Sequence, residues 1–108
     1  MIRQLFEMRL KPGALAEYVR LHDEVPTKHQ DLAAAIRDAG IYREVVFVAD
    51  PLLMVYAEVS DPDAYPRLFA TEVHDRWAHL MAPLMELGPD GRAYMRFLDN
   101  VWEVDLTA

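Results

Sequence analysis

Two runs rich in β-branched and aromatic residues, 41–49 and 52–59, are separated only by Asp50-Pro51. Such residues favour β-strands, and an Asp-Pro pair favours a turn. Because so short a connection joins antiparallel neighbours, the two runs predict a β-hairpin. Both runs are apolar on successive residues, which predicts that other protein surfaces cover both faces of the sheet they belong to.

Strand-like and helical periods alternate on either side of this hairpin. Residues 2–10 alternate in polarity and predict a strand with one buried face. Apolar residues then follow helical spacing from about 12 to 39, with a bend at Pro26. A second helix is expected over 71–85, and the run 93–104 has the composition of a closing strand.

The order strand, helix, strand, strand, helix, strand is that of the split βαβ motif. We therefore predict an α+β, ferredoxin-like fold, in which a four-stranded antiparallel sheet carries its helices on one face. The 108 residues suit a single domain, spanning 1–108. Since the second face of the sheet also needs cover, we expect two copies to pack sheet against sheet as a homodimer, a dimeric α+β barrel.

Charge and composition limit the kinds of molecule that the protein is expected to bind. The chain has 11 basic and 18 acidic residues, a net charge of -7, which argues against nucleic acid and favours a neutral ligand. Cysteine is absent, so that neither a disulfide framework nor a thiolate metal site is expected. No apolar run is long enough for a membrane span, and we expect a cytoplasmic protein.

The strongest chemical candidates are Tyr18 and His22. They lie four residues apart in a predicted helix and should therefore share one of its faces. An imidazole exchanges protons near neutral pH, and a neighbouring phenol can orient a hydroxylated ligand. The four histidines show no metal-binding spacing, and no phosphate-binding glycine motif is present, so we expect neither a metal nor a cofactor.

In its order of motifs the chain resembles the L-rhamnose mutarotase family. The resemblance covers nearly the whole chain and rests on the following segments: the strand MIRQLFEMRL, the helix with Glu17, Tyr18 and His22, the triplet Ala39-Gly40-Ile41, and TEVHDRW from Thr71 to Trp77 followed by Met81. It implies a ferredoxin-like homodimer. It also implies an isomerase that interconverts the α and β anomers of a 6-deoxy-hexose such as L-rhamnose or L-fucose without a cofactor.

The resemblance further implies roles for individual residues. His22 stands at the family's proton-donor position, Tyr18 at a substrate-binding position and Trp77 at the first of two adjacent tryptophans that bind the sugar. Ala78 replaces the second tryptophan, and Glu44 replaces a binding tyrosine. We add Glu44 to the candidate binding residues, together with Arg76, beside Trp77, and His29, seven residues after His22.

Two alternatives remain open from the sequence. One is another enzyme of the dimeric α+β barrel type, such as an aromatic polyketide cyclase or a cofactor-free monooxygenase, which would have an apolar pocket for polyaromatic compounds. The other is a non-catalytic module for binding a small ligand. That module is favoured if Tyr18 and His22 are buried against core side chains with no cavity beside them.

Overall fold

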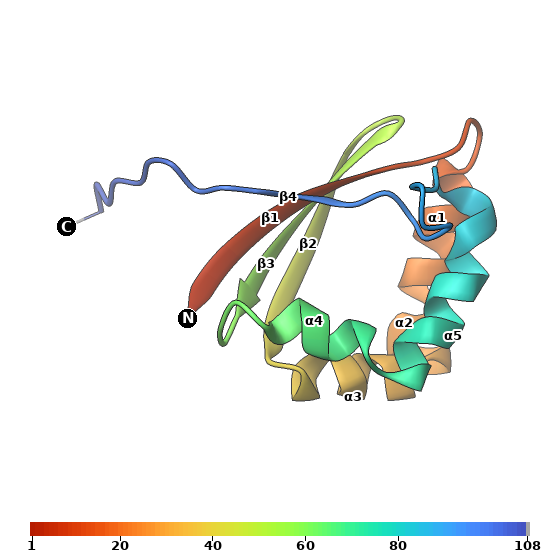
Figure 1. The fold of residues 1–108 in the computed structure, drawn as a ribbon, viewed down its shortest axis with the longest axis horizontal. Coiled ribbons are helices and arrows are strands. Elements are labelled where there is room, and N and C mark those ends of the chain that lie inside the picture. Colours follow the sequence, from red (N-terminus) through yellow and green to blue (C-terminus); the bar gives the residue numbers. More distant parts are fainter. Residues whose placement is uncertain (108) are drawn as a thin grey trace.

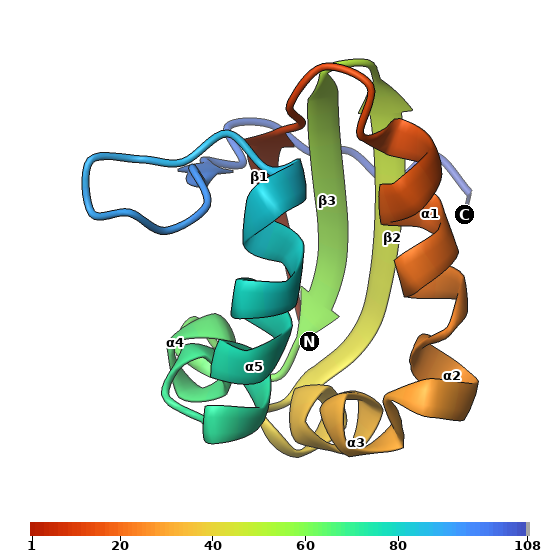
Figure 2. The same ribbon diagram turned by 90° about the vertical axis from the view of Figure 1, so that its right-hand side faces the viewer.

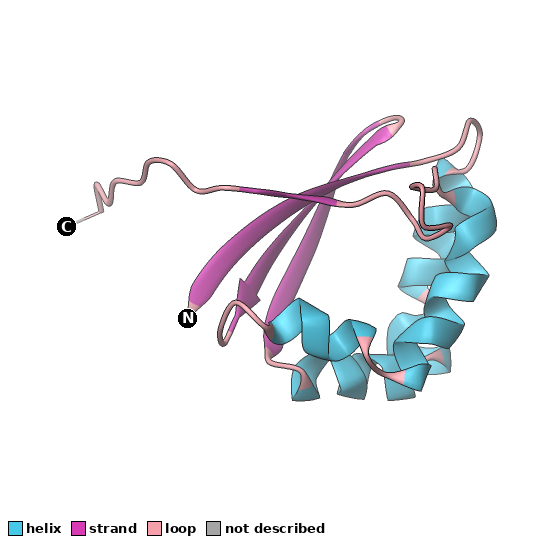
Figure 3. Cartoon of the chain, in the orientation of Figure 1, coloured by secondary structure: helices cyan, strands magenta, loops and turns pink. Residues whose placement is uncertain are grey.

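The computed structural model describes residues 1–107 as a sheet with helices on one face (Figures 1 and 3). The strands are β1 (Ile2–Arg9), β2 (Ile41–Ala49), β3 (Leu52–Val59) and β4 (Arg96–Leu98). The helices are α1 (Leu15–Asp23), α2 (Val25–Lys28), α3 (Gln30–Asp38), α4 (Ala64–Phe69), α5 (Glu72–Met81) and the 3-10 turn η1 (Ala82–Leu84). None of these helices has the length and apolarity needed to cross a membrane.

The sheet has the strand order β2-β3-β1-β4, and each neighbouring pair is antiparallel. β2 and β3 form the predicted hairpin, in which Ala49 pairs with Leu52 across the turn at Asp50-Pro51. Figure 2 shows the helices in front of the sheet, with α1 and α5 along its two flanks and α3 and α4 toward one end. The predicted ferredoxin-like fold is confirmed.

The bent helix predicted over 12–39 is divided into three helices. α1 begins at Leu15, because the chain first turns at Gly13, whose positive φ of 77° suits glycine. Pro26 lies in the first turn of α2, where its missing N–H costs no helical hydrogen bond. The chain then leaves helical geometry at His29, with φ -130° and ψ 49°, before α3 begins. Each break changes the direction of the helical layer.

The second helical segment also differs from the prediction. A separate short helix, α4, precedes α5 and supplies the buried side chains of Tyr65 and Leu68. As predicted, α5 begins directly after Thr71, whose side chain accepts a hydrogen bond from the His74 backbone N–H. The helix ends at Met81 rather than Met85, because Pro83 lacks the N–H that a further turn needs.

The predicted closing strand 93–104 is wrong in length, since β4 covers only Arg96–Leu98. Leu98 pairs with Leu5, and continuing this register would place Val101 opposite Ile2. Within residues 1–107, Ile2, Arg3 and Gln4 of β1 pair with β3 alone. Residues 99–107 therefore run past the sheet as an extended segment (Figure 1), in which Val101, Trp102 and Leu106 are largely exposed.

Two apolar clusters attach the helices to the sheet at different places. One packs α3 and α4 against β1 and β3 and contains Phe6, Ala39, Ile41, Val55, Ala57, Val59, Ala64, Tyr65 and Leu68. The other packs α1 and α5 at the far end of the same strands and contains Leu10, Ala14, Tyr18, Leu21, Leu53, Met81 and Met85. The helices are thus anchored at both ends of the sheet and diverge between them.

No helix within residues 1–107 covers the other face of the sheet (Figure 1). Strand register places Leu5, Val45, Tyr56 and Leu98 in one row across all four strands. Side chains alternate along a strand, and Ala57, next to Tyr56, is buried against the helices, so this row faces away from them. We call this row, with the exposed Phe47 beside it, the open apolar row.

Leu53 provides a test of the packing at the α1 and α5 end, because its side chain has no solvent exposure. Leu53→Ala should lower the free energy of unfolding by about 2–5 kcal/mol through lost burial and a residual cavity. Urea unfolding followed by circular dichroism measures this change. Leu106→Ala, at an 84% exposed position, should stay within about 0.5 kcal/mol of the parent. A similar small effect at Leu53 would contradict the packing described.

Candidate active site

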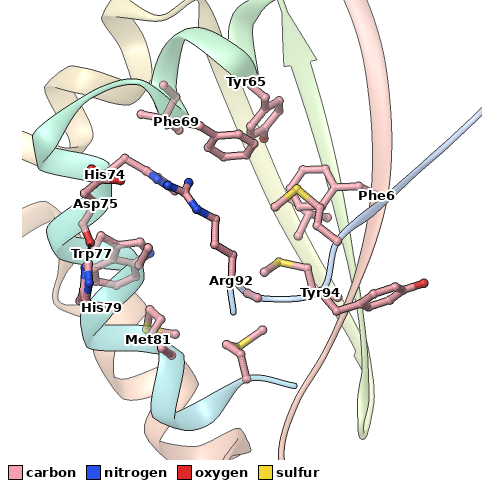
Figure 4. A pocket seen from close by; sticks show the side chains of 18 of the residues that line it. Phe6, Tyr65, Phe69, His74, Asp75, Trp77, His79, Met81, Arg92 and Tyr94 are labelled. Carbon is pink, nitrogen blue, oxygen red and sulfur yellow. Dashed lines mark hydrogen bonds between the residues drawn. The ribbon is translucent and has the colours of Figure 1, made fainter. Parts of the chain in front are cut away.

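A cavity of about 990 Å³ lies between the sheet and the diverging helices. This volume is at the upper end of the range of about 300–1,000 Å³ that is usual for small-molecule sites. Its walls come from β1, β2, β3, α1, α4, α5 and the loop 88–95, and Figure 4 shows part of the lining. Both Tyr18 and His22 line it, so the condition that favoured a non-catalytic module is not met.

Tyr18 and His22 form a stacked pair on α1. Their ring centroids are 4.0 Å apart with planes inclined by 30°, as expected for residues four apart on one helical face. The Nδ1 atom of His22 is 2.8 Å from the Tyr18 carbonyl oxygen. Because a carbonyl only accepts, Nδ1 carries the hydrogen and Nε2 of the neutral ring keeps a free lone pair. Burial also lowers the pKa of His22, which favours this neutral form.

Trp77 on α5 faces the pair from across the helical layer. Its ring meets the edge of His22 at a centroid distance of 5.1 Å, and the ring of His29 lies 5.4 Å away in a similar edge-to-face arrangement. Trp77 lines the cavity, whereas His29 does not. Arg76 points elsewhere, since its guanidinium forms an exposed ion pair with Asp31 on α3. The structure thus gathers Tyr18, His22 and Trp77 and leaves Arg76 outside the cavity.

Glu44 lies on the helix-facing side of β2, because its register partner Ala57 is buried in the core. Its carboxylate accepts a hydrogen bond of 2.5 Å from the hydroxyl of Tyr65. As a whole residue Glu44 is exposed, since β2 is an edge strand and the cavity beside it is open. The protein atoms around its carboxyl group nevertheless raise the Glu44 pKa by desolvation, which the Tyr65 bond only partly offsets.

Tyr65 was not among the predicted site residues, and the structure gives it a role beside Glu44. Its ring packs against Phe6 at 5.1 Å and Phe69 at 5.8 Å, which holds the hydroxyl in place. In the sequence, Tyr65 and Leu68 share a helical face, a pattern that indicates a core position and nothing more. Burial and the Glu44 carboxylate together raise the pKa of the Tyr65 phenol, so it stays protonated and donates.

The opposite wall of the cavity includes His74, Ala78 and Arg92. Ala78, which the resemblance aligns with the family's second tryptophan, contributes only a methyl group to this wall. His74 is partly buried, and desolvation lowers its pKa. Met81 and Met85 are core residues and also line the cavity. Within residues 1–107, no three His, Asp or Glu side chains come together in an arrangement that would hold a metal ion.

The site therefore combines a free imidazole nitrogen with a carboxyl group that surrounding protein atoms partly desolvate. Burial shifts the two groups in opposite directions, lowering the pKa of His22 and raising that of Glu44. A neutral imidazole can accept a proton while a protonated carboxyl group donates one. Burial, and to a smaller extent the nearby Glu44 carboxylate, raise the pKa of the Tyr18 phenol, so that it also remains a hydrogen-bond donor. The site thus contains a candidate general base, His22, and a candidate general acid, Glu44, for concerted catalysis on a polar ligand.

Comparisons with known proteins agree with this description. The family model for L-rhamnose mutarotase matches residues 3–104. An L-rhamnose mutarotase from Burkholderia orbicola is 36% identical over 102 residues, covering 93% of this chain and 95% of the relative. The crystal structure of an L-rhamnose mutarotase from Formosa agariphila superposes with a TM-score of 0.77 at 23% identity, covering 97% of this chain and all of that one.

A dimeric ferredoxin-like protein from an uncultured marine organism has the same fold, with a TM-score of 0.57 at 15% identity over 98% of this chain and 97% of its own. The resemblance drawn from Tyr18, His22 and the segment 71–77 is thereby confirmed. By the match over residues 3–104 and the identity to a named relative, this chain belongs to the L-rhamnose mutarotase family, whose members are isomerases that act on carbohydrates.

Proposed function

We propose that this protein interconverts the α and β anomers of an aldose such as L-rhamnose. The observation that carries the proposal is the hydrogen bond from His22 Nδ1 to the Tyr18 carbonyl, on the wall of a cavity that also contains the Glu44 carboxyl group. It leaves Nε2 of His22 as a base opposite a potential acid. Ring opening of a pyranose needs both groups at once.

The proposed step transfers two protons. Nε2 of His22 takes the proton of the anomeric hydroxyl, the bond between C1 and the ring oxygen breaks, and the ring oxygen receives a proton from the Glu44 carboxyl group. The open aldehyde rotates about its C1–C2 bond. Closure on the other face reverses the transfers, with His22 returning its proton to O1 and Glu44 recovering its own, so both residues are regenerated.

The remaining candidates bind or position the sugar. The face of Trp77 is suited to the C–H surface of a pyranose, and the Tyr18 hydroxyl to one of its oxygens. His29 packs edge-on against Trp77 and acts as a positioning residue for that ring. Arg76 acts in the same indirect way, since its ion pair with Asp31 links α5 to α3.

Neither alternative has a comparable observation in its favour. A cyclase or monooxygenase for polyaromatic compounds does not require a carboxyl group beside an imidazole, and the family match favours the mutarotase. A non-catalytic module does not require a free imidazole nitrogen on a cavity wall. We also propose the cytoplasm as the location, a proposal supported by the absence of cysteine and hence of disulfides.

His22→Ala should lower the enzyme-catalysed rate of anomer exchange about 10²–10⁴-fold, because it removes the base. Saturation-transfer NMR on the two anomer signals of L-rhamnose measures the rate. Val19→Ala, on the exposed side of the same helix, is the matched control and should retain the parent rate. An absence of acceleration by the parent over a panel of hexoses and 6-deoxy-hexoses would refute the proposed activity.

The rate should also follow a bell-shaped pH profile. Acid protonates His22, and because burial lowers the pKa of this residue, the acid limb should lie below pH 6.5. Alkali deprotonates Glu44, and Glu44→Gln should lower the rate and abolish the decline at high pH. The same NMR assay between pH 4.5 and 9 provides the profile. An acid limb centred above pH 7 would be inconsistent with His22 as the base.

We further propose that two copies form a homodimer through the open apolar row and the exposed Phe47. The row spans all four strands, and no helix of the described chain covers it. Phe47 is 62% exposed in the single chain, which is unusual for an aromatic residue in the middle of a strand. A second copy that packs its own sheet on this face would bury both rows.

Phe47→Lys should shift the protein from dimer to monomer at micromolar concentration, because it would bury a charge in the interface. Size-exclusion chromatography with light scattering should give twice the 12.4 kDa chain mass for the parent and the single chain mass for the variant. Leu80→Lys, an exposed position on α5, should leave the dimer intact. If Phe47→Lys remains dimeric while folded, the contact lies elsewhere.

A further inference from the structure

One cation in the cavity has no part in the proposed step. Arg92 enters from the loop 88–95, on the wall opposite β2, and Figure 4 shows its side chain extending across the cavity toward His74. The two groups are close enough for the guanidinium to lower the His74 pKa. Within residues 1–107, Arg92 takes part in no ion pair and its guanidinium in no side-chain hydrogen bond.

The backbone of Arg92 is held in place on both sides. Its carbonyl accepts a hydrogen bond of 2.7 Å from Gly88 N–H, and its own N–H donates to the Asp90 carboxylate at 3.0 Å. Two residues later, Tyr94 turns to the other face of the sheet, where its hydroxyl donates to Glu7 at 2.7 Å. Arg96 also pairs with Glu7, at 2.9 Å. The loop is thus fastened to β1 while Arg92 projects inward.

The charges around the cavity are unevenly distributed. Glu44 lies beside Tyr65 on the sheet side, and its pKa is set by burial and by the Tyr65 hydroxyl. Arg92 instead acts on His74, whose Nδ1 is shielded from solvent and has no hydrogen-bond partner within residues 1–107. Asp75 and Asp90 are the acidic groups that line this wall, and neither pairs with the guanidinium. One end of the cavity therefore offers a carboxyl group and the other an unpaired cation.

A guanidinium presents a planar fork of donors that matches a carboxylate, and such pairs are stronger when partly shielded from water. A 6-deoxy sugar has only a methyl group at C6 and leaves this fork unused. The net charge of -7 does not prevent anion binding, since exposed charges are screened beyond about 8 Å at physiological ionic strength. A ligand with its anomeric carbon near His22 and an acidic group at its far end would match the catalytic groups at one end of the cavity and Arg92 at the other.

We propose that the cavity accepts an aldose bearing a carboxylate, a hexuronic acid, with its acid group bound by Arg92. This assignment rests on the proposed mutarotase activity and specifies its substrate class. Ring opening proceeds as described for the neutral sugar, and the carboxylate takes no part in the proton transfers. Pairing of the carboxylate with Arg92, on the wall opposite β2, orients the sugar in the cavity.

The test compares sugars that differ only at C6. D-Galacturonate is measured against D-galactose and 6-deoxy-D-galactose, and D-mannuronate against D-mannose and 6-deoxy-D-mannose, alongside L-rhamnose, by saturation-transfer NMR. At least one uronate should exceed its 6-deoxy counterpart in kcat/KM by tenfold or more. Arg92→Gln should reduce the uronate value at least tenfold more than the neutral value, chiefly through KM, and Arg92→Lys should restore part of it.

Arg37→Gln, on the exposed surface of α3, is the matched control and should change neither value. Faster exchange of every neutral sugar than of its uronate, or equal losses in Arg92→Gln for both, would overturn the uronate assignment and leave the mutarotase proposal standing. If no sugar is accelerated, the mutarotase proposal fails. Ligand-observed NMR then still tests whether the parent binds a uronate. If the parent does not bind it, or if Arg92→Gln binds it equally well, the role of Arg92 is overturned. A change of oligomeric state in Arg92→Gln would assign the guanidinium to a partner's carboxylate instead.

Discussion

The site depends on one packing constraint: the helices attach to the sheet through two separate apolar clusters. One apolar cluster fastens α3 and α4 near Val59, and the other fastens α1 and α5 near Leu53. Between them the helices do not reach the strands, because the breaks at Pro26 and His29 turn the helical layer away. A continuous helix over the same residues would lie along the sheet and fill this space. The cavity is therefore a product of packing at its two ends.

Burial then determines the chemistry of the groups that line the cavity. Desolvation penalises charge, so it lowers the pKa of His22 and raises that of Glu44. Hydrogen bonds give each group its direction: the Tyr18 carbonyl selects the tautomer of His22, and the Tyr65 hydroxyl holds one oxygen of Glu44. The same cavity that admits a ligand thus shifts the imidazole toward its neutral, proton-accepting form and the carboxyl group toward its protonated, proton-donating form.

Two substitutions relative to the family pattern alter the cavity in related ways. The resemblance implies aromatic residues at both positions, so Ala78 opens one wall of the cavity and Glu44 places a carboxyl group in the implied position of a phenol. Both residues line the cavity, in which Tyr18 stacks on His22 and His22 meets Trp77 edge to face. Glu44 is both a binding residue and the proposed acid, so its presence affects the acid–base pair as well as the binding surface. Arg92 lies on a loop whose Tyr94 donates a hydrogen bond to Glu7 on the other face of the sheet.

Local periodicity was sufficient to predict the strands β1, β2 and β3, the hairpin, the fold class and the Tyr18–His22 pair. These features depend on residues at most a few positions apart, whose relative placement a helix or strand dictates. It could not predict the end of β4, because that depends on how many residues pair with β1, nor the division of the long helix, because a proline marks a break without giving its angle. The length of β4 was accordingly overestimated.

The tertiary structure alone decided how the site is completed. Alternation places Glu44 on one of two faces of its strand, and only the packing of the helices determines which face encloses a cavity. The bond from Tyr65 to Glu44 joins residues 21 positions apart, and Arg92 reaches His74 from a loop with no regular period. Sequence spacing determines which side chains share an element, whereas contacts between elements follow from the free energy of packing the whole chain.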